Sequence, residues 1–73
     1  MAARWTIINQ YPESAYPRGG DVIAGRRFVI REASTGTEDD FWLPASQLTP
    51  EIVTQEAQAR ADNIEAFSKL GGG

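Results

Sequence analysis

One stretch decides the fold of this chain: FWLPASQLTPE, residues 41–51. Its aromatic start is typical of a β-strand, and Pro44 ends that strand because proline has no N–H to donate to a sheet. Thr49 and Pro50 then mark the start of a helix, since threonine can cap free backbone amides and proline suits the first helical position. The stretch predicts β-structure before residue 44, a linker over 44–48 and a helix from residue 49.

Upstream of this junction, the sequence predicts an antiparallel hairpin and an N-terminal strand. Residues 26–32 place Phe28 and Ile30 on one face of a strand, and Gly36 supplies a turn that leads into residues 38–43. Residues 5–9 are rich in aromatic and β-branched side chains, which favour a first strand.

The segment between these strands is predicted to be irregular. Residues 10–20 hold two Tyr-Pro dipeptides, and proline biases the residue before it away from helical backbone. We expect a Tyr-Pro loop over 10–20. Residues 21–24 form either a short extended piece or the start of the second strand, interrupted at Gly25.

The fold class that follows is α+β. We expect one small domain over residues 1–73: a three-stranded, mainly antiparallel sheet within residues 1–43, and one long helix packed on it over 49–70. The three glycines of residues 71–73 stop that helix and form a flexible tail.

The predicted helix carries two apolar stripes. The first stripe joins the strand residues in a core, for which the sequence gives Ile7, Phe28, Ile30, Phe41, Leu43, Val53, Ile64 and Phe67. The second stripe consists of Ile52, Ala59, Ala66 and Leu70. One small sheet covers a single stripe well, so the second either contacts another chain or lies with the first in a groove.

The composition argues against an enzyme. The 73 residues include no cysteine and no histidine, which excludes disulfides, thiolate zinc sites and a histidine base for any serine. The acidic run of residues 38–40 lacks the spacing of a calcium loop and fits a solvated strand entry. We expect no catalytic residues, no metal ligands and no cofactor.

The charge distribution is uneven along the chain. Residues 1–36 carry five arginines against three acidic side chains, whereas residues 37–73 carry two basic against seven acidic ones. The net charge of −3 argues against nucleic-acid binding, which needs a cationic surface. If the two halves occupy different ends of the domain, head-to-tail stacking of copies is favoured; otherwise a basic hairpin and an acidic helix merely coexist.

Neither a signal peptide nor a membrane-spanning segment is predicted, because no purely apolar run exceeds three residues. We expect a soluble chain made in the cytoplasm. So small a domain buries only about 60–65% of the surface of its unfolded chain, and a partner would add the missing stability.

The predicted partners are other protein chains, in a homo-oligomer or a larger particle. Tryptophan and tyrosine are favoured at interface hot spots. The candidate interface residues are Trp5, Tyr11, Tyr16, Trp42, Ile52, Ala59, Ala66 and Leu70.

The order of motifs resembles that of small structural proteins of tailed bacteriophages. It runs GGDV at 19–22, FVI at 28–30, FWLP-x-S at 41–46 and TPE at 49–51, followed by an alanine-rich helix. The resemblance implies a non-enzymatic virion component of head, connector or tail, made in the host cytoplasm, and carries over no functional residues.

Two alternatives stay open. One is a small acidic inhibitor or regulator of a host protein that mimics nucleic acid, which requires acidic side chains gathered on one exposed face. The other is a ubiquitin-like modifier or sulfur carrier, suggested by the diglycine-like end over residues 70–73.

Overall fold

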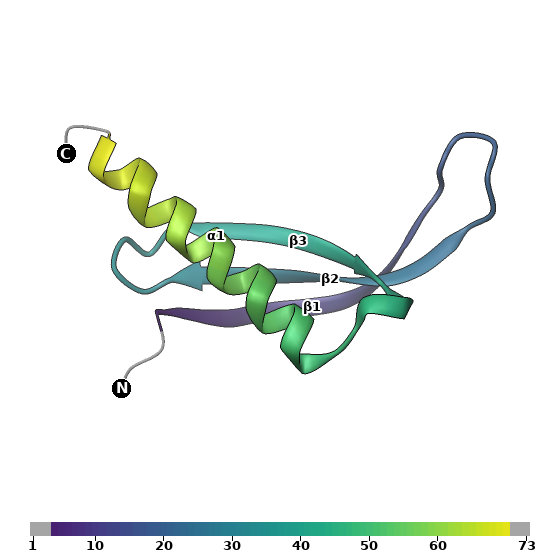
Figure 1. Cartoon of the computed structure of the whole chain (residues 1–73), viewed down its shortest axis with the longest axis horizontal. Helices are drawn as coiled ribbons and strands as arrows, with labels where there is room; N and C mark the ends of the chain where they lie inside the picture. Colours follow the sequence, from purple (N-terminus) through teal and green to yellow (C-terminus); the bar gives the residue numbers. More distant parts are fainter. Residues whose placement is uncertain (1–3, 71–73) are drawn as a thin grey trace.

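The computed structural model of the chain describes residues 4–70. Along them lie the strands β1 (Trp5–Ala15), β2 (Ile23–Glu32) and β3 (Glu38–Pro44), the 3-10 turn η1 (Ala45–Gln47) and the helix α1 (Pro50–Leu70). The strands form one antiparallel sheet in the order β1-β2-β3, and α1 lies diagonally across it (Figure 1). The predicted α+β fold is confirmed.

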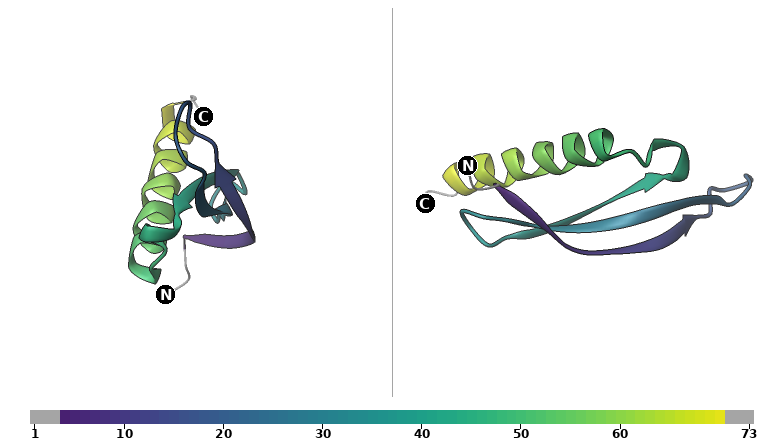
Figure 2. Two further views of the ribbon diagram at one scale, coloured as in Figure 1. Left: turned by 90° about the vertical axis from the view of Figure 1, so that its right-hand side faces the viewer. Right: turned by 90° about the horizontal axis from the view of Figure 1, so that it is seen from below.

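The helix begins where the sequence predicts. The Thr49 hydroxyl accepts a hydrogen bond from the backbone N–H of Ile52 at 3.2 Å, so Thr49 caps the first turn. In an edge-on view, α1 forms one layer and the twisted sheet forms the other (Figure 2). The second face of the sheet is left uncovered by the described elements.

The turn between β2 and β3 is built around the buried carboxylate of Glu32. Gly36, which was predicted to supply this turn, has a positive φ of 73°. The Glu32 carboxylate, on a residue only 1% exposed, accepts hydrogen bonds from the backbone N–H of Ser34 at 2.6 Å and of Thr35 at 3.2 Å. The hydroxyl of Ser34 also donates to it. These hydrogen bonds, chiefly that from the Ser34 hydroxyl, hold the pKa of Glu32 below its usual range, against the opposing effect of burial.

The predicted loop over residues 10–20 is wrong in its first half. β1 continues to Ala15, and residues 10–15 pair with β2 from Phe28 back to Ile23. A proline is tolerated there because β1 is an edge strand with one neighbour. The cross-strand pairing therefore outweighs the local effect of Pro12, and the loop is reduced to residues 16–22.

Gly25 lies inside a continuous β2 and does not interrupt it. The only register irregularity in the β1–β2 pairing falls between Ile7 and Asn9 instead. A Cβ atom at Gly25 would lie 2.5 Å from the indole of Trp42 and 2.4 Å from the backbone oxygen of Leu43. The glycine is needed because the side chain of Trp42 lies across β2 at this point.

The core lies between α1 and the middle of the sheet. Its buried apolar residues are Phe28, Ile30, Phe41, Leu43, Ala57 and Ala61. Ile7 and Val53 pack against it half-buried, as predicted, and the rings of Phe28 and Phe41 stack with centroids 5.3 Å apart. The two buried alanines let the helix backbone approach the sheet closely.

One predicted core residue is wrong. Phe67 is 69% exposed, and Ile64 is only half-buried. The last turns of α1 pass beyond the outline of the sheet in Figure 1, so the apolar stripe continues where no strand lies beneath it. Helical spacing correctly predicted which face of the helix points toward the sheet. It did not predict where along the helix the sheet ends.

The molecule is elongated. Its Cα radius of gyration is 14.1 Å and its principal extents are 44 × 27 × 17 Å. A compact chain of this length would have a radius of gyration of about 11 Å. The elongation comes from the β1–β2 hairpin, which extends past the end of β3 at one end of the molecule, and from the last turns of α1 at the other end (Figure 1).

Candidate protein interface

The part of the hairpin beyond β3 forms an arm, which we define as residues 14–24. β3 pairs with β2 only as far as Gly25, whereas Ser14 and Ala15 continue to pair with Ala24 and Ile23. At its tip, Gly19 has a φ of 72° and the N–H of Gly20 donates to the oxygen of Pro17 at 3.1 Å. This turn over residues 17–20 lies at the far end of the arm.

Three apolar side chains are exposed on the arm. Tyr16 is 78% exposed, Val22 57% and Ile23 43%. Sequence reasoning singled out Tyr16 but not the other two. The apolar pair Val22 and Ile23, which lies in the short stretch between Gly20 and Gly25, is the signal that could have identified them.

Trp42 supports the base of the arm. Its indole N–H donates to the backbone oxygen of Glu13 at 2.8 Å, so the side chain reaches from β3 over β2 to β1. Arg27 on the central strand adds a second link, with its Nε 2.7 Å from Glu13 and its Nη1 3.4 Å from Asp40. The hydrogen bond to Glu13 raises the pKa of Arg27. The half-buried Trp42 is therefore a structural contact of this chain's own fold.

Trp5 and Ile52 are also occupied by contacts within the chain. Both pack, half-buried, against the core, and the indole N–H of Trp5 donates to Oε1 of Gln58 at 3.2 Å. Beside Trp5, Arg4 pairs with Asp62 at 2.8 Å and with Glu65. These contacts attach the start of β1 to α1.

The second predicted stripe is exposed beyond its first member. Ala59 and Ala66 are exposed, and Leu70 is 77% exposed. Together with the exposed Phe67, Leu70 gives the last turn of α1 an apolar surface. Next to it, an open groove separates the helix from the β2–β3 turn. We call it the end groove, and its lining residues are Thr35, Thr37, Ile64, Phe67 and Ser68.

Tyr11 lies apart from both surfaces. Tyr11 on β1 lies opposite Arg27 on β2. Successive side chains of a strand point to opposite faces of the sheet, and the next residue of β2, Phe28, faces the helix. Tyr11 and Arg27 are therefore on the face of the sheet that α1 does not cover. Tyr11 is 39% exposed, as is Ile8. The ion pairs of Arg27 and of Arg31 with Glu38 cross β2 and β3 on the same face, which is therefore largely polar.

The two halves of the chain do not form separate charged ends. Seven of the ten acidic residues make ion pairs with Arg4, Arg27, Arg31 and Arg60. Most of these pairs join a basic residue of the first half to an acidic residue of the second. The uneven charge distribution of the sequence is mostly neutralised by ion pairs within the folded chain. It does not by itself give the folded chain one positive and one negative end.

Within residues 4–70, no group of three or more acidic side chains is arranged to hold a metal ion. The single helix of this region is not apolar enough to cross a bilayer. Comparison of the chain with protein-family models, with curated proteins and with solved structures gave no match.

Proposed function

We propose that this chain is a non-enzymatic structural subunit of a tailed-phage particle, held in a head, connector or tail by contacts with other protein chains. The observation that carries the proposal is the arm. Its side chains Tyr16, Val22 and Ile23 are exposed, and the core of the chain's own fold does not include them.

The form of the arm supports a role in contact with a neighbour. A two-stranded hairpin is marginally stable alone, because it buries little apolar surface. Here its base is held by Trp42 and by the ion pair of Arg27 with Glu13, which direct the arm away from the body of the molecule. Such an arm presents a tyrosine, a residue type favoured in interfaces, at a distance from the two-layer core.

The acidic-inhibitor alternative draws less support. A mimic of nucleic acid needs unpaired carboxylates on one face, at spacings that resemble phosphates. In the described residues most carboxylates are paired with arginines, and Glu32 is buried in its turn. The order of elements β1-β2-β3-α1 also differs from the ββαββ order of ubiquitin-like proteins, and Gly71–Gly73 lie outside the described residues.

The proposal is tested in the phage or prophage that encodes the chain. The gene is deleted and restored as wild type, as Tyr16→Glu or as Thr54→Glu. Thr54 is exposed on the first half of α1, away from the arm, and serves as the matched control. We expect purified particles to contain the wild-type and Thr54→Glu chains in fixed stoichiometry, and to lack the Tyr16→Glu chain.

The composition of the particles is read by quantitative mass spectrometry, together with the infectious titre. Normal particles that never contain the wild-type chain would contradict the proposal. The inhibitor alternative would then be favoured if deletion altered host physiology and left the particles unchanged.

A further inference from the structure

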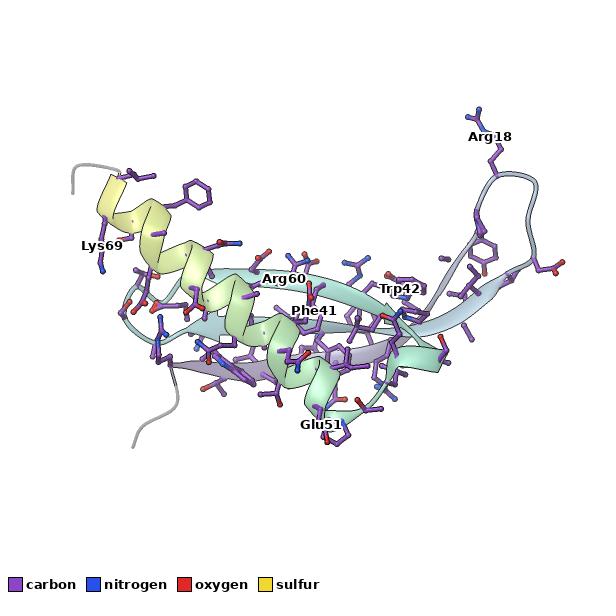
Figure 3. All side chains as sticks on the ribbon, viewed as in Figure 1. Arg18, Phe41, Trp42, Glu51, Arg60 and Lys69 are labelled. Carbon is purple, nitrogen blue, oxygen red and sulfur yellow. The ribbon has the colours of Figure 1, made fainter. Side chains whose placement is uncertain are left out.

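Two exposed apolar surfaces lie at opposite ends of the elongated molecule. One is the arm, with Tyr16, Val22 and Ile23, and the other is the end groove together with Leu70. Figure 3 shows Arg18 on the tip of the arm and Lys69 at the end of α1, separated along the longest axis of the molecule. Because that axis measures 44 Å, the arm cannot fold back onto the groove of its own chain.

We propose that the arm of one copy of this chain binds in the end groove of a second copy, in a head-to-tail contact. This inference rests on the proposed assembly function and names one partner for it. The groove is lined by Ile64 and Phe67 on the helix side and by Thr35 and Thr37 on the turn side, a mixed apolar and polar lining that suits an aromatic side chain with a polar tip such as Tyr16.

The charges at the two ends complement each other. Arg18 and Asp21 on the arm, and Lys69 on α1, make no ion pair within residues 4–70. In a head-to-tail contact Asp21 can pair with Lys69, and Arg18 approaches the negative end of the helix dipole. Contact between two helix ends would instead bring like charges together, two lysines and two negative dipole ends.

The shape of the molecule sets the expected strength of the contact. Its two shorter extents are 27 and 17 Å, so an end-on contact buries well under the roughly 800 Å² per partner of a standard interface. A single contact is therefore weak. A head-to-tail contact is heterologous, however, and repeats from copy to copy into a ring or a filament.

The test uses sedimentation of the purified chain at concentrations from about 10 μM to about 1 mM, the range in which weak contacts become populated. We expect the weight-average mass of the wild type to rise from 8.0 kDa with concentration. Tyr16→Glu and Phe67→Glu should each stay at the mass of a single chain. Both residues are exposed, so circular dichroism and the thermal midpoint should match those of the wild type. Thr54→Glu should associate as the wild type does.

An equimolar mixture of the two variants distinguishes the geometry. The Tyr16→Glu variant keeps an intact groove, and the Phe67→Glu variant keeps an intact arm. The arm of the second variant can therefore bind in the groove of the first, which gives one wild-type contact. The two acidic replacements repel, so the altered surfaces do not pair with each other. We expect the mixture to form a species of twice the single-chain mass and nothing larger.

Association of either variant alone, at the wild-type level, would overturn the inference, because it would show a contact between like surfaces. A wild type that stays at the single-chain mass throughout the range would also overturn it. In that case the deletion and complementation experiment still decides, independently, whether the chain is assembled with different partners.

Discussion

The indole of Trp42 occupies the space that a side chain at Gly25 would need, with Cζ2 of the ring 2.5 Å from the position of a Cβ atom. The same ring donates its N–H to Glu13 on the far strand, so all three strands meet at one point. This point is the base of the arm, and it links the packing of the sheet to the presentation of Tyr16.

Gly25→Ala should destabilise the fold by about 1–3 kcal/mol, the usual cost of forcing atoms into a filled site. For a domain of this size each kcal/mol lowers the thermal midpoint by roughly 4–8 °C. Combining it with Trp42→Ala should give a smaller loss than the sum of the two single changes, since removing the indole relieves the side-chain part of the clash and leaves only the part with the backbone oxygen of Leu43. Additive losses in thermal or denaturant unfolding would show that the two residues are not in contact.

Glu32→Gln should remove a pH-dependent part of the stability. The folded pKa of Glu32 is lowered, so its contribution is fully present above the unfolded value of about 4.3 and is lost as the pH falls through the folded pKa. The difference in denaturation midpoint between wild type and Glu32→Gln is therefore largest near neutral pH and shrinks below about pH 4. If the difference in denaturation midpoint between wild type and Glu32→Gln did not change with pH, the role assigned to this carboxylate would be contradicted.

Phe41 and Phe67 should differ sharply when each is replaced by alanine. Phe41 is 2% exposed, its ring stacks on that of Phe28, and the ring centroid lies 5.4 Å from the guanidinium of Arg60. Figure 3 labels Phe41 on β3 and Arg60 on the helix that covers it. Its replacement should cost about 3–5 kcal/mol, which is most of the stability of so small a domain. Phe67→Ala should change the stability by less than about 0.5 kcal/mol. Equal losses in equilibrium unfolding would mean that the end of α1 is covered in the monomer.

Ala57 and Ala59 provide a test of how closely α1 approaches the sheet. Ala57 is fully buried against the core, whereas Ala59 is exposed two positions along the same helix. Ala57→Leu should cost about 1–3 kcal/mol through overpacking, and Ala59→Leu should be within about 0.5 kcal/mol of neutral. Denaturant midpoints of the two variants measure the contrast, and a tolerated leucine at 57 would show that the two layers are not in close contact there.

The parts of the fold that could be predicted from the sequence are those with local signals. Pro44, Thr49 and Pro50 marked the ends of β3 and α1, and Gly36 marked the turn, because capping and φ preferences act within a few residues. The extension of β1 to Ala15 could not be predicted in this way. It depends on pairing with residues of β2 that follow later in the sequence.

The same limit applies to the candidate interface. Trp5 and Trp42 appeared available as anchors because their hydrogen-bond partners, Gln58 and Glu13, lie 53 and 29 residues away in the sequence. Phe67 was assigned to the core because helical spacing gives the face of a helix and not the edge of the sheet beneath it. The predicted interface residues that the structure leaves exposed are Tyr11, Tyr16, Ala59, Ala66 and Leu70.

The contacts that close the two layers, Trp5 with Gln58 and Arg4 with Glu65, join the start of the chain's first strand to a helix that follows all three strands in the sequence. Until α1 has left the ribosome, Phe28, Ile30 and Phe41 have no second layer to pack against. A nascent or truncated chain without the helix would present a bare apolar sheet with two open edges, which is a template for aggregation. A chain truncated before α1 should therefore aggregate more readily than the full chain.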